Sequence, residues 1–358
     1  MSEVNVGIIG AGSIGTRHLR NLEVLPGNKV VAVCDMNAMY AQKLASRVKA
    51  NVYTDLADMF KNEPNLDAVV LCLPPTVRRE VFEQAALRGV AVLCEKPPAR
   101  TMEEAQAISH LIDSSGIVCA AGFNWRYSPV LDRVRELTAG RTINVVISTY
   151  MSNLALTGGL RDWFYIKELS GGLILDQGIH LIDLMRYLMG DIVEAHTFAS
   201  NVIRPKSESF TSEDSTTSSL RFASGAIGVH VHSWANPGSS SFTVSGADFA
   251  LELDPWGSGQ PKLRGIFPGT DGKPCPIQED FTIASPAPKA ADGASTVTPP
   301  EPPVPTHFRE MQVFLEAVRS GDTRHIRSSW DDAMRSLAVA IAMNRSIESR
   351  ISEAVPLP

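Results

Sequence analysis

Short apolar runs alternate with amphipathic stretches along the first third of the chain. The apolar runs cover residues 4–9, 30–34, 67–73, 90–94 and 117–121, and the helix-patterned stretches cover 13–24, 37–49, 76–88 and 101–114. This alternation predicts an α/β fold with a parallel, doubly wound sheet. Such sheets bind ligands beyond the carboxyl ends of their strands. Polar residues that directly follow the apolar runs are therefore the first candidates for a functional site.

The pattern changes after about residue 122. Longer alternating segments predict an open, mainly antiparallel sheet with strands at 143–150, 192–203, 216–223, 226–234, 240–245 and 248–253. Residues 254–306 hold 12 of the 23 prolines and predict an extended arm, because proline continues neither helix nor sheet. Apolar periodicity predicts terminal helices over 307–347. We therefore expect two domains, a Rossmann-type domain at 1–122 and an α+β substrate and oligomerisation domain at 123–358.

Composition and charge narrow the classes of partner. The 358 residues are 44% hydrophobic and 20% charged, with a net charge of -6 and no basic run, which argues against nucleic acid. No apolar run reaches the roughly 18 residues of a membrane span, and no secretion signal is recognisable, so we expect a cytoplasmic protein. The predicted sheet leaves one face for helices or another subunit, which favours a homo-oligomer, a dimer or tetramer, formed through that sheet.

Cysteine usage does not point to a metal or redox centre. The count of five is odd, there is no Cys-x-x-Cys, and four thiols end apolar runs as small core residues would: Cys34, Cys72, Cys94 and Cys119.

A glycine-rich turn follows the first apolar run. It reads Gly10-Ala11-Gly12-Ser13-Ile14-Gly15, and Asp35 ends the second apolar run. Glycines at this spacing allow a tight strand-to-helix turn and a close approach of backbone amides to a pyrophosphate. An acid at the position of Asp35 binds ribose hydroxyls and repels a 2'-phosphate, so we expect NAD rather than NADP as cofactor. The alternative is a glycine-rich turn that binds nothing.

A helix-patterned segment at 170–187 carries an aligned set of polar residues. Asp176, His180, Asp183 and Tyr187 follow the spacing i, i+4, i+7 and i+11, so they share one helix face that carries no Lys or Glu. We interpret this face as functional. The alternatives are a face turned to solvent and a core histidine hydrogen-bonded by Asp183.

Four signatures together resemble the family of glucose-fructose oxidoreductase and inositol dehydrogenase, called Gfo/Idh/MocA. They are the glycine loop with His18, Glu95-Lys96-Pro97, the stretch 122–129, and Gly171-Gly172 leading into Asp176-x-x-x-His180. The resemblance covers essentially the whole chain. It implies a Rossmann domain, an open-sheet second domain, and NAD(P)-dependent oxidation of sugars, inositols or their derivatives. It also implies that Lys96, Asp176 and His180 surround the reacting carbon.

The chemistry of alcohol oxidation gives each of these residues a role. His180 is the expected proton acceptor, because its reference pKa of about 6.5 suits neutral pH. Lys96 would stabilise the developing oxyanion, and Asp176 would hold a substrate hydroxyl or orient His180. Further cofactor contacts are expected from Pro74 and Glu95, and Lys96 is expected to contact the cofactor as well.

Substrate contacts are expected from residues in two aromatic-rich segments. Asn124 and Arg126 either line a cleft or tie the interdomain connection together. Arg161, Trp163 and Tyr165 are the expected substrate wall, because aromatic rings stack on sugars, although packing alone would also explain them.

Three other functions remain open at this point. Transient oxidation by a bound NAD would support a redox-neutral lyase, epimerase or glycosidase, which forms no net NADH. A non-catalytic dinucleotide-binding regulator would also use this fold. A metal-dependent isomerase would use His230 and His232, but no carboxylate stands at ligand spacing, and we expect no metal.

Overall fold

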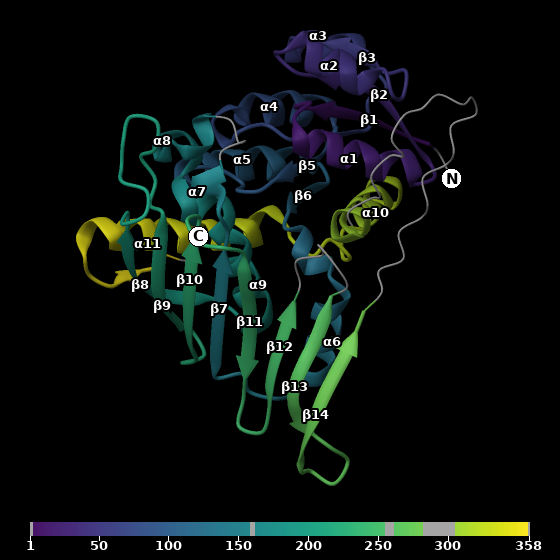
Figure 1. Ribbon diagram of the computed structural model, residues 1–358. Helices are drawn as coiled ribbons and strands as arrows, with labels where there is room; N and C mark the ends of the chain where they lie inside the picture. The colour runs from purple at the N-terminus through teal and green to yellow at the C-terminus, as the bar shows by residue number, and fades with distance from the viewer. Residues whose placement is uncertain (1–2, 158–161, 255–260, 282–304, 357–358) are drawn as a thin grey trace, which may run out of the picture. The chain divides into compact units, whose positions relative to one another are not determined.

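The computed structural model describes residues 3–157, 162–254, 261–281 and 305–356 (Figure 1). The chain forms two compact units. The first combines residues 1–96, 106–127 and 283–330, and the second combines 97–105, 128–282 and 331–358. Among the helices of the described ranges, none has both the length and the apolar character needed to cross a bilayer.

The first unit contains a six-stranded, fully parallel sheet in the order β3-β2-β1-β4-β5-β6. The strands are β1 (Val4–Ile9), β2 (Asn28–Cys34), β3 (Asn51–Tyr53), β4 (Ala68–Leu71), β5 (Ala91–Glu95) and β6 (Cys119–Gly122). The helices between them are α1 (Ser13–Val24), α2 (Ala38–Ala45), α3 (Leu56–Asn62), α4 (Arg79–Arg88) and α5 (Met102–Ser115). The predicted doubly wound sheet is confirmed. Only β3 and α3 were missed, because both are short and β3 is partly exposed.

The core of this unit includes a helix from far along the chain. Helix α10 (Pro305–Ser320) contributes Met311, Phe314 and Leu315 to the same buried cluster as Leu19 and Leu22 of α1. The expected boundary at residue 122 assigned this helix to the second domain. The compact units divide the chain differently, because the apolar face of α10 packs against α1 and β1.

The second unit contains a nine-stranded sheet in the order β14-β13-β12-β11-β7-β10-β9-β8-β15. Neighbouring strands are antiparallel, except that β7 and β10 are parallel. The strands are β7 (Val145–Met151), β8 (Ile192–Ser200), β9 (Ser215–Phe222), β10 (Ile227–Ser233), β11 (Ser239–Ser245), β12 (Ala250–Asp254), β13 (Lys262–Pro268), β14 (Pro274–Asp280) and β15 (Glu353–Ala354). The predicted open, mainly antiparallel sheet is confirmed.

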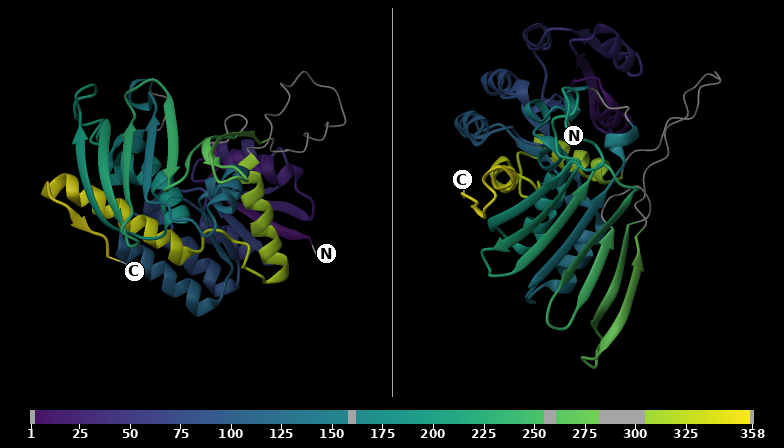
Figure 2. Two further views of the ribbon diagram at one scale, coloured as in Figure 1. Left: turned by 90° about the horizontal axis from the view of Figure 1, so that it is seen from below. Right: turned by 60° about the vertical axis from the view of Figure 1, so that its left-hand side comes forward.

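Helices cover one face of this sheet. They are α6 (Pro129–Thr138), α9 (Ile179–Met189) and α11 (Trp330–Ser349), and Figure 2 shows α11 crossing the direction of the strands. Side chains on β9 and β10 alternate between buried and exposed. Large apolar side chains are exposed on these strands and their neighbours, among them Ile147, Phe198 and Ile227. One face of the sheet is therefore open in the single chain.

The predicted proline-rich arm is partly a hairpin. Strands β13 and β14 lie within residues 254–306, and the remaining residues of that stretch are mostly outside the described ranges. The expectation of an extended arm is therefore wrong for 262–280. Sheet structure is possible there because Pro274 begins β14, and Pro276 lies within it, at the edge of the sheet, where a missing N–H interrupts no inner ladder.

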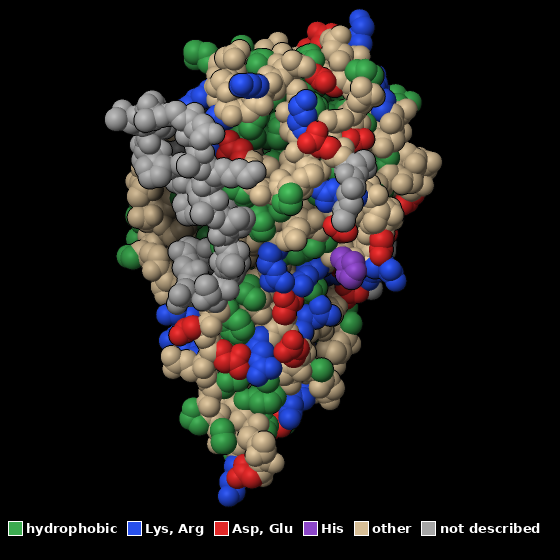
Figure 3. All heavy atoms as spheres, turned by 90° about the vertical axis from the view of Figure 1, so that its right-hand side faces the viewer, with side chains coloured by type: hydrophobic (Ala, Val, Ile, Leu, Met, Phe, Trp, Pro, Cys, Tyr) green, Lys and Arg blue, Asp and Glu red, His purple; other side chains and the backbone are tan. Residues whose placement is uncertain are grey.

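Lys and Arg side chains are mixed with Asp and Glu on the face that Figure 3 shows. This mixture agrees with the balanced composition and small net charge of the chain.

Candidate active site

The glycine loop connects β1 to α1 with two glycines that no other residue could replace without strain. Gly10 has φ +97°, and a Cβ there would lie 2.6 Å from the carbonyl oxygen of Cys72. A Cβ on Gly15 would lie 2.0 Å from the carbonyl oxygen of Gly10. Helix α1 then begins at Ser13, and no side chain caps its first turn. The first-turn amides are thus suited to a phosphate group.

Asp35 follows β2 and lies against this loop. Its Oδ2 accepts a hydrogen bond from the backbone N of Ala11 at 2.8 Å, and its Oδ1 accepts one from Asn37 N at 2.9 Å. The neighbouring Met36 is 93% exposed. Glycines that a Cβ would fill, an uncapped helix terminus and an adjacent carboxylate fit the pyrophosphate and ribose of NAD.

Glu95 ends β5 and is buried, with its side chain held inside the first unit. Its Oε1 lies 2.7 Å from Nε2 of His18 on α1, and His18 is fully buried. Burial would raise the pKa of Glu95, but the hydrogen bond and charge of His18 hold it well below its usual range. Glu95 was expected to contact the cofactor, yet the structure gives it a contact that joins α1 to β5. Lys96, the next residue, is partly exposed.

Arg78 is a residue that the sequence reasoning missed. It precedes α4, is buried, and donates from Nε and Nη2 to the carbonyl oxygen of Leu73 and from Nη1 to that of Glu95. Leu73 precedes Pro74, another expected cofactor contact. The neighbouring Arg79 is exposed, and the sequence offers no signal that tells the two arginines apart.

Asn124 and Arg126 are also buried within the first unit. Asn124 Nδ2 donates to Thr306 Oγ1 at 2.7 Å and to His307 Nδ1 at 3.0 Å, while Arg126 donates to the carbonyl oxygen of Arg327. Both residues are 2% exposed. These contacts favour the alternative in which the two residues tie segments of the chain together over the one in which they line a cleft. The segments that they join both belong to the first unit.

The segment that carries Asp176 and His180 is less regular than expected. A short helix α8 (Lys167–Ser170) precedes the π-helical turn η4 (Ile174–Gly178), which leads into α9. Asp176 lies in this turn and is buried, and His180 lies in the first turn of α9 and is partly exposed. π-Helical turns are frequent at functional sites, because they reorient side chains relative to a regular helix.

The other two members of the expected polar face have structural contacts. Asp183 is 1% exposed and accepts a hydrogen bond from Ser336 of α11 at 2.9 Å. Tyr187 accepts one from Arg135 of α6 at 2.6 Å. The expectation of one functional face with four residues is therefore too broad, because α9 packs between α6 and α11 at these positions.

One side chain of the sheet, Tyr150, interacts with the charge of Asp176 and was not expected there. Burial raises the pKa of Tyr150 on β7, and the charge of Asp176 raises it further. The Tyr150 ring packs edge-on against His232 of β10, with centroids 5.3 Å apart. The alternating pattern of residues on β10 indicated which of its side chains share one face of the strand, but it could not show which helix covers that face.

His230 and His232 are neutral core residues in this arrangement. Burial lowers the pKa of His230 to about 4 and that of His232 well below its usual value. The described residues include no group of three or more His, Cys, Asp or Glu side chains that could hold a metal ion.

The expected substrate wall is only partly described. Arg161 lies outside the described residues. Tyr165 is buried, its hydroxyl donates to the carbonyl oxygen of Leu154 at 2.9 Å, and the Arg204 guanidinium covers its ring. Burial and these contacts favour the packing explanation for Tyr165 over a place in the substrate wall. Trp163 is partly exposed and packs edge-on against Phe164.

Comparison with known proteins finds a family match for the N-terminal part of the chain and another for the part that follows it. Residues 4–123 match the oxidoreductase family with an NAD-binding Rossmann fold, and residues 130–252 match the GFO/IDH/MocA C-terminal domain. The scyllo-inositol 2-dehydrogenase (NAD(+)) of Bacillus subtilis is 28% identical over 356 residues, covering 97% of this chain and 95% of the relative. The inositol 2-dehydrogenase of Rhizobium meliloti is 26% identical over 357 residues, covering 97% of this chain and 98% of the relative.

Solved structures share the fold along the whole chain. A levoglucosan dehydrogenase in complex with NADH superimposes with a TM-score of 0.82 at 22% identity, covering 100% of both chains. The two family matches together span more than half of the sequence. The chain therefore belongs to the GFO/IDH/MocA family of NAD-binding oxidoreductases.

Proposed function

We propose that this enzyme oxidises a secondary alcohol of an inositol, sugar or sugar derivative with NAD, and catalyses the reverse reduction. Relatives that align along nearly the whole chain are inositol dehydrogenases, which supports a cyclic polyol as substrate class. The observation that carries the proposal is the placement of buried Asp176 in a π-helical turn that leads directly into the first turn of α9, where His180 lies.

The first unit has the residues to hold the cofactor. The amides of the turn from Gly10 to Gly15 and the start of α1 would bind the pyrophosphate, and Asp35 would accept hydrogen bonds from the ribose. Ser13, Ile14 and Pro74 remain proposed cofactor contacts. When bound, NAD supplies the hydride acceptor for alcohol oxidation.

The chemical roles follow from the side-chain types. His180 takes the proton of the reacting hydroxyl during oxidation and returns it during reduction. Lys96 stabilises the negative charge that develops on the same oxygen. Asp176 is acceptor-only when ionised, so it holds a neighbouring substrate hydroxyl or orients His180. Tyr150, whose pKa is raised by the charge of Asp176 in addition to burial, is a further proposed substrate contact. Trp163 and Arg161 also remain proposed substrate contacts.

We further propose that the enzyme works as a homo-oligomer through the open face of its second sheet. Ile147, Phe198 and Ile227 are exposed on that face in the single chain, and contiguous exposed apolar side chains are typical of interfaces. Sedimentation velocity, with Phe198→Glu as the variant, tests this proposal. A monomeric wild-type chain would contradict it.

The enzymatic proposal is tested with a panel of inositols, hexoses and levoglucosan. Thermal shift identifies ligands in the presence of NAD, and absorbance at 340 nm then follows NADH during turnover. We expect steady NADH formation with at least one polyol. A substrate that is converted without net NADH formation would instead favour the redox-neutral lyase or epimerase. No conversion of any panel member by an enzyme that binds NAD would favour a regulator.

A further inference from the structure

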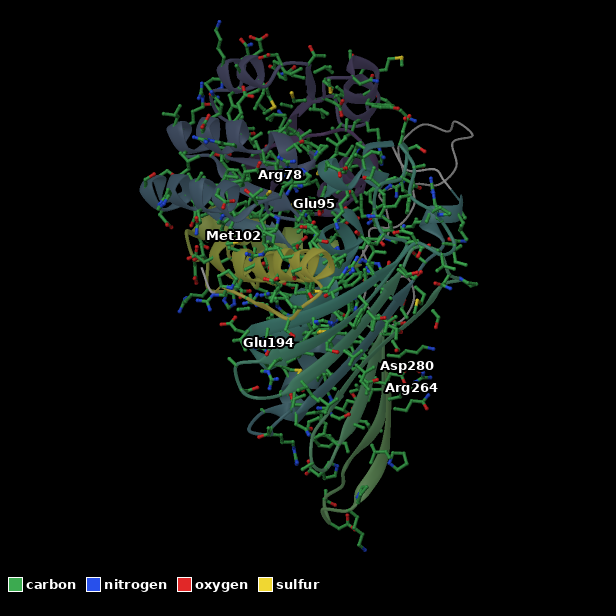
Figure 4. All side chains as sticks on the ribbon, turned by 90° about the vertical axis from the view of Figure 1, so that its left-hand side faces the viewer. Arg78, Glu95, Met102, Glu194, Arg264 and Asp280 are labelled. Atoms are coloured by element: carbon green, nitrogen blue, oxygen red, sulfur yellow. The ribbon has the colours of Figure 1, made fainter. Side chains whose placement is uncertain are left out.

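Glu95, the residue before Lys96, is held at two separate atoms. Figure 4 shows Arg78 and Glu95 as neighbours in the first unit. The side-chain carboxylate of Glu95 is bound by His18, and its backbone carbonyl is bound by Arg78. Neither His18 nor Arg78 belongs to the glycine loop or to the proposed catalytic set.

His18 holds the side chain of Glu95 from helix α1. The carboxylate is an acceptor only, so Nε2 of His18 is the donor across the 2.7 Å contact. The pair is desolvated, since His18 is fully buried and Glu95 is 7% exposed. The His18 ring is itself packed edge-on against His307 of α10, which fixes its plane. A buried, charge-assisted hydrogen bond of this kind is short and geometrically strict.

Arg78 holds the main chain at the same residue. Its Nη1 donates to the carbonyl oxygen of Glu95, while Nε and Nη2 donate to that of Leu73 at 3.1 and 2.7 Å. The planar guanidinium thus joins the ends of two neighbouring parallel strands, β4 and β5. Arginine is suited to this task because its donors are fixed in one rigid fork.

These two contacts act on the residue that carries the proposed oxyanion group. Lys96 directly follows the anchored Glu95 and is directly followed by Pro97, whose ring restricts the backbone further. The start of the Lys96 side chain is therefore held in place, although the residue as a whole is partly exposed. We infer that His18 and Arg78 are positioning residues that hold Glu95, and through it Lys96, in the geometry needed for turnover. This inference rests on the proposed role of Lys96.

The test compares each positioning residue with a matched control. His18→Leu removes the donor to Glu95, whereas His18→Gln retains an N–H donor at a similar reach. Arg78→Met removes the guanidinium but retains an unbranched stem. If the Met variant does not fold, Arg78→Lys, which lacks the rigid fork of donors, replaces it as the loss variant. Arg79→Met and His110→Leu are the controls, because both residues are exposed.

With the substrate from the panel and saturating NAD, kcat should fall about ten- to a hundredfold in His18→Leu and Arg78→Met, because small displacements of a catalytic group have effects of that size. His18→Gln should recover most of the loss, and both controls should stay within about twofold of the wild type. Affinity for NAD, measured by calorimetry, should change far less than kcat. Amide exchange in the peptide around Glu95 and Lys96 should accelerate in the two loss variants only.

A double-mutant cycle separates positioning of Lys96 from general structural damage. In a Lys96→Ala background, adding His18→Leu or Arg78→Met should lower kcat by no more than about twofold, because the group they position is gone. The inference would be overturned if His18→Leu or Arg78→Met lowered kcat as much in the Lys96→Ala background as in the wild type. Full kcat in both single variants would overturn it as well. A normal kcat in Lys96→Ala alone would instead overturn the proposed role of Lys96, and unchanged amide exchange would show that the anchor itself is absent.

Discussion

Asp35 and Ala11 are joined by a hydrogen bond of 2.8 Å from the backbone N of Ala11 to Oδ2 of Asp35. The end of β2 is thereby tied to the glycine loop that precedes α1. A dinucleotide bound on this loop would meet a carboxylate at its ribose, and a 2'-phosphate would meet the same negative charge.

The first prediction concerns cofactor choice. The wild type should bind NAD more tightly than NADP, and Asp35→Ser combined with Met36→Arg should shift the preference toward NADP. The substitution removes the repelling carboxylate and adds a cation at a position that is 93% exposed. Titration of both cofactors by calorimetry measures the change. Met39→Arg, which adds the same charge at another exposed position, is the control. Equal or tighter binding of NADP than of NAD by the wild type would contradict the prediction.

The second prediction separates two glycines of the loop. Gly12→Val should abolish NAD binding and leave the fold intact, because Gly12 has φ -74°, which any residue adopts, and its side chain would occupy the phosphate position. Gly15→Val should instead lower the melting temperature, since its Cβ would lie 2.0 Å from Gly10 O. Circular dichroism and NAD titration distinguish the two effects. Normal binding by Gly12→Val would exclude this loop as the phosphate site.

The third prediction concerns the catalytic residues. His180→Ala should lower kcat by about a hundred- to ten-thousandfold, because it removes the proton acceptor, and it should leave NAD affinity nearly unchanged. Lys96→Ala should lower kcat comparably. Asp176→Ala should raise KM at least as much as it lowers kcat if it holds a substrate hydroxyl. Near-normal kcat in both the His180 and the Lys96 variants would remove their assignment.

The fourth prediction uses Asp183 as the structural counterpart of Asp176. Asp183→Ala should destabilise the fold by about 1–3 kcal/mol, because it leaves the buried Ser336 hydroxyl without this acceptor. At temperatures where the variant is folded, its KM should equal that of the wild type. Urea unfolding and steady-state kinetics measure the two quantities. A KM effect as large as that of Asp176→Ala would mean that Asp183 contacts substrate.

The fifth prediction is a loss of stability in mild acid. Burial lowers the pKa of His230 to about 4 and that of His307 to about 3, whereas both should titrate near 6.5 in the unfolded chain. Below pH 6.5 the unfolded chain binds these protons first, so the free energy of unfolding falls as pH drops from about 6.5 toward 4. Each histidine contributes up to about 3 kcal/mol to this fall.

Urea unfolding between pH 7.5 and pH 5 measures this dependence. His230→Met should flatten it, because one buried titrating group is removed. His110→Met, at an exposed position, should leave the slope unchanged. A free energy of unfolding that stays constant over this range in the wild type would contradict the prediction.

The sequence pattern was sufficient for those elements whose signal is local. The alternation of strands and helices predicted every strand and helix between β1 and β6 except β3 and α3, because a buried parallel strand must be apolar throughout. The sequence pattern could not predict the contacts of Glu95, Asn124 and Asp183. Each depends on a partner far along the chain, namely His18, Thr306 and Ser336, and periodicity contains no information on such pairs.

Two local rules also gave wrong answers. Proline content argued against sheet structure in the stretch that contains β13 and β14, but strand position at an edge made the prolines tolerable. A regular helical period placed four polar residues on one face. In the structure, Asp183 and Tyr187 contact α11 and α6, and Asp176 lies in the π-helical turn η4.

Helix α10 has a consequence for the order in which this protein matures during synthesis. The ribosome completes all six strands of the first sheet by residue 122, yet Met311, Phe314 and Leu315 emerge only after strands β7 to β14 of the second sheet have been made. Until then, Leu19 and Leu22 of α1 lack part of their apolar packing. A nascent or proteolysed chain that ends before residue 305 therefore exposes an unfinished nucleotide-binding core, which makes such fragments prone to aggregation and to capture by chaperones.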